Sequence, residues 1–317
     1  MIELVSKTQR NNYEKDGYML MGSLLQQSFV EELQGEVKRL VAEAAGKDAG
    51  DDFYDFEDSH KPREAPRVRR ITMPQNQSEA FGRLMQHPVI LSVCKQLLGT
   101  DSIRRSNFKL NLKSPGFGSA IEWHQDFAFY PCTNRSLLAV GVMIDACMLD
   151  NGPLLVFPGS HKGMLHDHHE NGVFVGAMNL EDCGLDEKNT IALTGPAGSV
   201  SFHDTFLVHG SGLNRSAKGR AMAFLEVGAA DAWPIHGGLG EMFGPDLSLL
   251  EKSMLCGAMT TQPRMESVQL RIPWPRPILK HRSIYGFQSH LKKTSFQKYS
   301  EERDEPAQKK QKSQDFE

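Results

Sequence analysis

The 317-residue sequence lacks the features that would place a protein in a membrane, in an oxidising compartment or on nucleic acid. It has no run of about 18 or more apolar residues, so it predicts no transmembrane helix. Its five cysteines are scattered and include no CxxC pair, which is typical of reduced thiols in a reducing compartment. Its formal net charge of -3 argues against a general nucleic-acid-binding protein, which would have a basic balance.

Targeting signals are also missing. The N-terminus has no basic segment followed by an apolar one, and the last residues are not a peroxisomal address of the Ser-Lys-Leu type. We therefore expect a cytoplasmic protein, a monomer or a homodimer, with neither nucleic acid nor a membrane as partner. Hydrophobic residues make up 39% and charged residues 24%, which is ordinary for a soluble protein with one large core.

The first hundred residues are predicted to be largely helical. Residues 8–22 indicate a short helix followed by a short strand, and apolar residues at helical spacing over 30–41 indicate a second helix. Ser28 is the expected N-cap of that helix, with Glu31 as its capping-box partner. Residues 46–67 are rich in Gly, Asp, Lys and Pro, which predicts a long loop or lid.

After about residue 100 the pattern changes from helical to strand-like. Residues 78–98 predict a pair of helices broken near Pro88, and from about residue 103 short apolar runs are separated by Gly, Pro and Asn. Several short strands punctuated by turns indicate a β-sandwich or jelly roll. The expected strands are Phe108–Leu112, Leu137–Ile144, Leu154–Phe157, Thr190–Leu193, Ser199–Phe202, Phe206–Val208 and Ala221–Val227.

These patterns predict a mainly β fold with flanking helices. Residues 1–297 are expected to form a single domain, with a helical N-terminal part over about 8–100 and a jelly-roll core over about 103–230. A C-terminal extension follows over 231–297. Residues 298–317 are almost all charged or polar, which is typical of a disordered tail.

One short motif carries the chemistry. His124 and Asp126 are two residues apart, so in an extended strand both side chains lie on the same face. With one distant histidine they form two imidazoles and a carboxylate, the facial triad of non-haem Fe(II) oxygenases, which leaves coordination positions open. We predict His209 as the third ligand, because the small residues 210–212 that follow it allow a bound group to approach the backbone closely.

Two further features support this site. Arg220 follows His209 by eleven residues, at the start of another expected strand. A buried iron site that uses a dicarboxylate needs a cation for its far carboxylate, and arginine binds one with two parallel hydrogen bonds. Phe127, Phe129 and Tyr130 follow the first two ligands and can form the wall of an apolar pocket.

The sequence has twelve histidines, so other ligand sets need consideration. The polar cluster His166–His169 includes Asp167, but adjacent histidines in a polar loop are expected to be exposed. His161 lies in a turn-rich loop, where it either lines the mouth of the site or makes a structural hydrogen bond. His203 is expected near the metal, although the surrounding pattern favours His209 as the ligand.

Together, four motifs resemble the phytanoyl-CoA dioxygenase superfamily. They occur in the family's order, and the similarity runs from roughly residue 10 to 230. They are Trp123–Pro131, Asp150–Leu154 with Phe157–Gly163, Phe202-His203, and His209–Asn214 with Arg220. The resemblance implies a double-stranded β-helix core of the jelly-roll or cupin-like type, Fe(II) as the metal and 2-oxoglutarate as cosubstrate.

The resemblance also assigns roles to single residues. His124, Asp126 and His209 match the iron ligands of the family. The positions that match cosubstrate-binding residues are Arg220 for the distal carboxylate, Ser211 for a supporting hydroxyl, and Gln125, Lys109 and Arg70 for further contacts. Val142 stands where the phytanoyl-CoA enzyme has a cosubstrate-contacting tryptophan, which separates this chain from that enzyme's substrate.

The implied activity is a 2-oxoglutarate-dependent hydroxylation of an unactivated C–H bond, in an acyl-CoA-like substrate or a small metabolite. The reaction consumes dioxygen and releases succinate and carbon dioxide, with ascorbate as a supporting reductant. Asp126 occupies the coordination position that a halide would need, which disfavours a halogenase. The alternatives are desaturation or cyclisation in natural-product biosynthesis, a non-catalytic jelly-roll binding protein, and a zinc hydrolase, for which no residue is a convincing general base.

Overall fold

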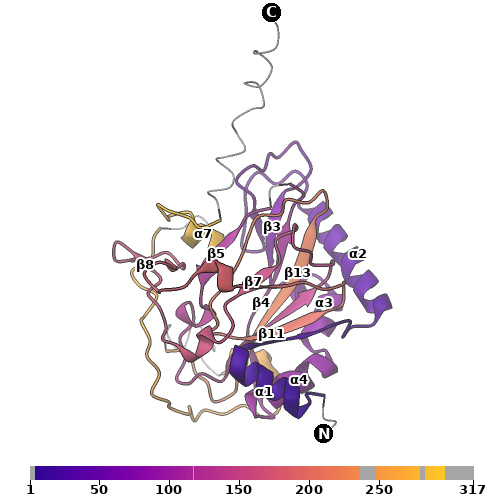
Figure 1. Ribbon diagram of the computed structural model, residues 1–317. Helices are drawn as coiled ribbons and strands as arrows, with labels where there is room; N and C mark the ends of the chain where they lie inside the picture. The colour runs from indigo at the N-terminus through magenta and orange to yellow at the C-terminus, as the bar shows by residue number, and fades with distance from the viewer. Residues whose placement is uncertain (1–3, 117, 236–246, 279–282, 297–317) are drawn as a thin grey trace, which may run out of the picture.

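Two antiparallel sheets form the centre of the molecule (Figure 1). The computed structural model describes residues 4–116, 118–235, 247–278 and 283–296. The larger sheet has eight strands in the order β1-β11-β6-β13-β4-β3-β2, with β14 also paired to β4. The smaller sheet has four strands in the order β10-β7-β12-β5, and β8 and β9 form a separate pair.

The strands are short, except for two long ones at the centre of the larger sheet. The larger sheet consists of β1 (Tyr18–Met21), β2 (Tyr54–Phe56), β3 (Val68–Thr72), β4 (Ile103–Lys113), β6 (Leu137–Met143), β11 (Val200–Asp204), β13 (Arg220–Ala229) and β14 (Met254–Cys256). The smaller sheet and the separate pair consist of β5 (Ile121–His124), β7 (Leu154–Val156), β10 (Ile191–Leu193), β12 (His209–Ser211), β8 (His169–Glu170) and β9 (Val173–Phe174).

Helices cover the outer face of the larger sheet. They are α1 (Lys7–Asp16), α2 (Gln27–Glu43), α3 (Glu79–Met85) and α4 (Pro88–Leu98), and α2 and α3 lie beside the larger sheet in Figure 1. Helix α2 buries Val30, Leu33 and Leu40, which share one face because helical neighbours recur every three to four residues. These side chains belong to the same apolar core as the outward residues of β4, β6 and β13.

The two faces of β13 have different environments, although all of its residues are buried. Alternate residues of a strand point to opposite faces. Ala221, Ala223, Leu225 and Val227 pack in the core beneath the helices. The residues between them face a cavity on the inner side of the sheet. A strand buried on both sides therefore supplies both the apolar core and the polar wall of a site.

Most of the expected elements are present, and the predicted jelly-roll class is confirmed. Three local predictions were wrong. The N-cap of α2 is Gln26 and not Ser28, so the helix begins before the capping box. The expected loop over 46–67 contains β2, which pairs with β3. Residues 206–208 form a turn, held by a hydrogen bond from the Phe206 amide to Asp204, and the next strand begins at His209.

The residues after β13 form short elements that attach to the two sheets. Helix α6 (Ser248–Ser253) leads into β14, and α7 (Ile284–Gln288) lies beside β5 (Figure 1). None of the helices in the described part of the chain is long and apolar enough to cross a membrane. The division into a domain and a tail remains a prediction, since residues 298–317 lie outside the described residues.

Candidate metal centre

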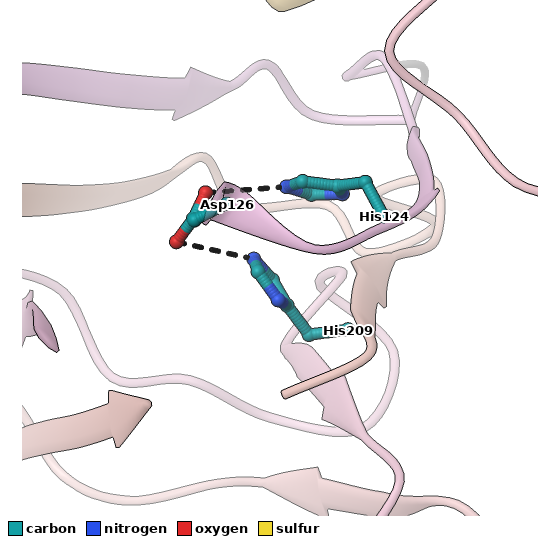
Figure 2. Close-up of side chains that lie close together, drawn as sticks. All are labelled: His124, Asp126 and His209. Carbon is teal, nitrogen blue, oxygen red and sulfur yellow. Dashed lines mark ion pairs between the residues drawn. The ribbon is translucent and has the colours of Figure 1, made fainter. Parts of the chain in front are cut away.

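Two histidines on neighbouring strands of the smaller sheet face each other. His124 is the last residue of β5 and His209 is the first residue of β12. The antiparallel register pairs them directly, and their ring centroids lie 4.1 Å apart. One strand pair therefore brings together two side chains that are distant in the sequence (Figure 2).

Asp126 completes the group, although it does not lie in a strand. The sequence predicted His124 and Asp126 on one continuous strand, but β5 ends at His124 and a 3-10 helix begins at Asp126. Gln125 between them stays extended, so both flanking side chains still turn to the same side. The Asp126 carboxylate lies 3.6 Å from His124 Nε2 and 3.8 Å from His209 Nε2. One ligand atom from each residue lies within 4.8 Å of the other two.

Backbone carbonyls fix the tautomer of both imidazoles. His124 Nδ1 lies 2.8 Å from the Glu122 carbonyl oxygen, and His209 Nδ1 lies 2.8 Å from the Leu207 carbonyl oxygen. Because a carbonyl only accepts hydrogen bonds, each Nδ1 carries the proton and each Nε2 keeps its lone pair. Two such nitrogens and one carboxylate that face a common point fit a divalent metal ion with open coordination positions.

The protonation states also suit a metal. Burial and the neighbouring His124 lower the pKa of His209 well below its ordinary value, although Asp126 opposes this. Burial alone would raise the pKa of Asp126, but His209, His124 and His203 together hold it well below its ordinary value. At neutral pH His209 is therefore neutral and Asp126 is charged, which is the state in which both can bind a cation.

A further buried imidazole holds Asp126 from the other side. His203 on β11 lies across the cavity, with its Nε2 3.4 Å from Asp126 Oδ2 and its ring centroid 4.7 Å from that of His209. The sequence placed His203 near the metal, and the structure agrees. Among the described residues, the ligand atoms that lie close enough to share a metal ion come from His124, Asp126 and His209. We therefore assign His203 as a partner of Asp126 and not as a ligand.

Gln125 does not reach the cavity, in contrast to its predicted contact with the cosubstrate. Its amide Nε2 donates to the carbonyls of Met164 and Phe206, and its Oε1 accepts from the His166 amide. The side chain between two inward-facing ligands points the opposite way, as the alternation of extended backbone requires. Gln125 therefore fixes the ligand strand to the loop behind it.

His168, which the sequence placed on an exposed loop, is buried and supports the same strand. Its Nε2 accepts a hydrogen bond of 2.9 Å from the Gln125 amide, and its Nδ1 lies 2.8 Å from the His166 carbonyl. These contacts require a neutral ring, and burial lowers the pKa of His168 to about 3. The polar neighbours of His168 in the sequence gave no sign of this burial, because the contact is made across 43 residues.

The cavity around the ligands continues to Arg220. This side chain is 3% exposed, donates from Nη2 to the Gly152 carbonyl, and has no ion-pair partner among the described residues. Its Nε has no hydrogen-bond partner in the residues that the structure describes. Ser211 also lines the cavity and donates to the same Gly152 carbonyl at 3.0 Å. The structure thus brings the predicted carboxylate-binding pair together at one end of the cavity.

Lys113 lies beside this pair and was missed from the sequence. It faces Arg220 in the register between β4 and β13, and its Nζ donates to the carbonyls of Ser211 and Gly212. Burial, followed by the nearby Arg220, lowers the pKa of Lys113 well below its ordinary value. Gly152 makes this packing possible, because a Cβ there would lie 2.6 Å from the Gly212 carbonyl oxygen and 2.9 Å from the Lys113 chain.

The two weaker predictions, Lys109 and Arg70, have different positions. Lys109 lines the cavity, but its Nζ donates to Glu226 Oε1 at 2.5 Å. Arg70 lies on β3 opposite Asn111 and does not belong to the described cavity lining. Burial lowers the pKa of Arg70, and its Nε has no hydrogen-bond partner. Glu226 lines the cavity as well, and no sequence motif indicated it.

Two members of the expected aromatic wall, Phe127 and Phe129, lie behind the ligands and do not line the cavity. Phe127 packs against Phe206 in a second apolar core, and Phe129 contacts the edge of the His124 ring at 5.8 Å between centroids. Val142 faces the core beneath the helices, so it does not occupy a cosubstrate position. Of the two roles considered for His161, the structure shows the structural hydrogen bond, with its Nε2 3.2 Å from the Glu14 carbonyl oxygen.

Comparison with known proteins places the chain among the enzymes that its motifs resemble. The sequence profile of the family described as phytanoyl-CoA dioxygenase (PhyH) matches residues 13–222. The chain belongs to this family. That membership confirms the predicted class, a non-haem iron dioxygenase that uses 2-oxoglutarate, together with iron and 2-oxoglutarate as its cofactors.

Relatives of known name share most of the chain. A probable alpha-ketoglutarate-dependent hypophosphite dioxygenase of Stutzerimonas stutzeri is 35% identical over 283 residues, which cover 88% of this chain and 93% of the relative. An ectoine dioxygenase of Bordetella bronchiseptica is 29% identical over 70% of this chain and 75% of its own length. The crystal structure of EctD from S. alaskensis with 2-oxoglutarate and 5-hydroxyectoine aligns with a TM-score of 0.60 at 27% identity, covering 71% of this chain and 77% of that one.

Proposed function

We propose that this dioxygenase hydroxylates a small polar metabolite, with iron held by His124, Asp126 and His209 and 2-oxoglutarate anchored by Arg220. One observation carries the proposal. Three ligand atoms within 4.8 Å of one another open into a cavity whose far end is a buried arginine, and no carboxylate among the described residues pairs with it. Bound there, iron with 2-oxoglutarate and dioxygen supplies the oxidation, and the products are the hydroxylated substrate, succinate and carbon dioxide.

Arg220 and Ser211 explain how the chain selects a dicarboxylate. A buried guanidinium without a counter-charge costs several kcal/mol, on the order of that for other buried ions, so an anion is expected beside it. The free Nε of Arg220 and the Ser211 hydroxyl face the cavity from β13 and β12. A carboxylate in this position would accept charge-assisted hydrogen bonds, which are roughly twice as strong as neutral ones.

The cavity beside the metal ligands is narrow. It is walled by Ile121, Leu154, Met222, Phe224 and Ile284, and the cavity volume between them is only about 30 Å³. A cavity this small favours a compact substrate over the long chain and large head group of an acyl-CoA. The named relatives also act on small polar compounds, ectoine and hypophosphite. Of the two predicted substrate classes, these observations support the small metabolite.

Succinate release tests this function directly. We expect the purified protein with Fe(II), 2-oxoglutarate and dioxygen to form succinate, and His124→Ala and Asp126→Ala each to abolish it, because each removes one of three ligands. His290→Ala, which removes an exposed histidine, is the matched control and should keep full activity. Full activity in either ligand variant would overturn the assignment. The product's mass separates the alternatives: hydroxylation adds one oxygen atom, whereas desaturation or cyclisation removes two hydrogen atoms.

A further inference from the structure

The cavity has a second polar end, on the opposite side of the metal ligands from Arg220. Along β13 the inward-facing residues are Arg220, Met222, Phe224 and Glu226. At a rise of about 3.3 Å per residue, Glu226 lies about 20 Å from Arg220 along the strand. The two charged side chains therefore mark separate ends of one cavity, and a single 2-oxoglutarate does not occupy both.

The strand register places Glu226 close to the metal ligands. Glu226 pairs with Ala139 on β6, and Ala139 pairs with His203 on β11. Glu226 is therefore two strands away from His203, about 10 Å at the usual strand spacing. His203 in turn contacts Asp126 at 3.4 Å. A substrate beside the metal can reach Glu226 without passing Arg220.

Glu226 is buried, but only one of its two carboxylate oxygens is hydrogen-bonded to a described residue. The residue is 2% exposed, and its Oε1 accepts the hydrogen bond from Lys109 Nζ. Within the described part of the chain, its Oε2 has no hydrogen-bond partner, and neither does the hydroxyl of Tyr130. Burial first, then the charges of Asp126 and Glu226 and the closeness of Glu226 as a hydrogen-bond acceptor, raise the pKa of Tyr130 well above its ordinary value, so this hydroxyl lies near both carboxylates and can donate to Glu226. Buried carboxylate oxygens are seldom left without a hydrogen-bond donor, so this one points to a group that a ligand supplies.

We propose that Glu226 and Lys109 form the substrate-recognition pair of this enzyme and select a small zwitterion. This proposal rests on the function proposed above. The free Oε2 of Glu226 can accept a further hydrogen bond, and a carboxylate favours a protonated amine or amidine as the donor. Lys109 keeps N–H donors beyond the one that it gives to Glu226, and these fit the acidic group of the same molecule. Buried Arg70 also interacts with the charge of Glu226, so the group offers both signs of charge to one ligand, whereas a lone small anion uses only the positive one.

The competing explanation is a purely structural ion pair, and kinetics separate the two. We would measure substrate-stimulated succinate release with the twenty amino acids and ectoine as zwitterionic probes and hypophosphite as the anionic probe. At least one zwitterion should stimulate release above the rate without substrate, and more strongly than hypophosphite. Glu226→Gln should raise the KM for that zwitterion by about tenfold or more, the loss expected for a charge-assisted hydrogen bond. The KM for 2-oxoglutarate should change less than about twofold, because Arg220 lies at the other end.

Two further variants make the result decisive. Lys109→Met should also raise the KM for the zwitterion, whereas Glu57→Gln, which removes a buried carboxyl outside the cavity, should not. A structural pair would instead lower the melting temperature and shift both KM values together. Stimulation by hypophosphite alone, by no zwitterion, or by a zwitterion whose KM Glu226→Gln leaves unchanged would overturn this inference. Absence of any 2-oxoglutarate turnover in the wild type would overturn the proposed function as well, so the two failures are distinguishable.

Discussion

At the scale of single residues, the site depends on side chains that are held in one state by their backbone contacts. His124 and His209 are fixed by carbonyls, and Asp126 by His203. Gln125 and His168 then fix the backbone that carries the ligands. The residues that touch the metal are thus a minority of those that determine its geometry, as is usual where supporting hydrogen bonds orient metal ligands.

His168 should make the stability of the metal-free protein depend on pH. Its pKa is about 3 in the folded protein, against an ordinary value of 6.5, so the unfolded chain takes up a proton first as pH falls. The contribution of neutral His168 to the free energy of unfolding is therefore complete above about pH 6.5. Below that pH it declines by up to about 1.4 kcal/mol per pH unit. Urea unfolding at pH 7, 6 and 5 should show this loss, and His168→Gln should reduce the slope. Equal slopes for both proteins would contradict the assignment.

Arg220 should control the affinity for 2-oxoglutarate. Arg220→Lys keeps a positive charge but loses the forked geometry, so the KM for 2-oxoglutarate should rise by about tenfold, and Arg220→Ala should raise it further. Lys218→Ala removes an exposed charge two residues away and serves as the control. Initial rates of succinate formation against 2-oxoglutarate concentration measure the effect. An unchanged KM in Arg220→Ala would place the carboxylate elsewhere, and Lys113 would be the next residue to test.

At the scale of elements, the strand that carries His124 is clamped by a segment near the end of the chain. The Glu122 carboxylate accepts hydrogen bonds from the amides of Ser295 and Phe296. Gln288 on α7 accepts from the Glu122 amide at 2.9 Å and donates to the Gly176 carbonyl at 3.0 Å. The family match ends at residue 222, so Gln288, Ser295 and Phe296, which hold Glu122, lie outside it. The C-terminal extension is therefore part of the site's support.

Replacing Gln288 should weaken both the fold and the metal site. Gln288→Ala leaves the buried Glu122 amide without an acceptor, which should cost about 1–3 kcal/mol of unfolding free energy. Because β5 ends at His124, Mn(II) should also bind more weakly. Gln288→Glu, which keeps the acceptor but loses the donor, should fall between Gln288→Ala and the wild type. Gln262→Ala is the exposed control. Thermal unfolding and Mn(II) titration measure the two effects, and a stable variant with normal Mn(II) affinity would show that the clamp is dispensable.

Local sequence patterns predicted the elements whose determinants are local. The apolar spacing of α2 and the Pro88 break between α3 and α4 are examples. The ligand motif was also recognisable, because His124 and Asp126 are only two residues apart in the sequence.

The errors arose where contacts between residues distant in the sequence determine the structure. Strand β2 exists because β3 pairs with it. Lys113 lies beside Arg220 only because β4 and β13 pair in one register, and the same pairing puts Glu226 in the cavity wall. The burial of His168 has the same origin.

At the scale of the whole molecule, the site lies between two sheets that contribute different functions. The smaller sheet carries His124 and His209 on β5 and β12. The larger sheet carries Arg220 and Glu226 on β13, and its other face is fixed by the helices. Neither sheet holds a complete site. A cosubstrate that binds both the metal and Arg220 must therefore connect the two sheets, and the stability of the protein should report that connection.

Thermal unfolding with Mn(II), which substitutes for iron without oxidation, tests this bridging. Mn(II) alone should raise the melting temperature, since a ligand at 100 times its Kd adds about 2.7 kcal/mol. 2-Oxoglutarate alone should raise it little, because it then has only the Arg220 end to bind. Both together should raise it by more than the sum of the separate shifts, since each ligand completes the other's site. Asp126→Ala should lose the Mn(II) shift and the excess, whereas Arg220→Ala should lose only the excess. Purely additive shifts in the wild type would mean that metal and cosubstrate bind independently, and the bridge between the sheets would be refuted.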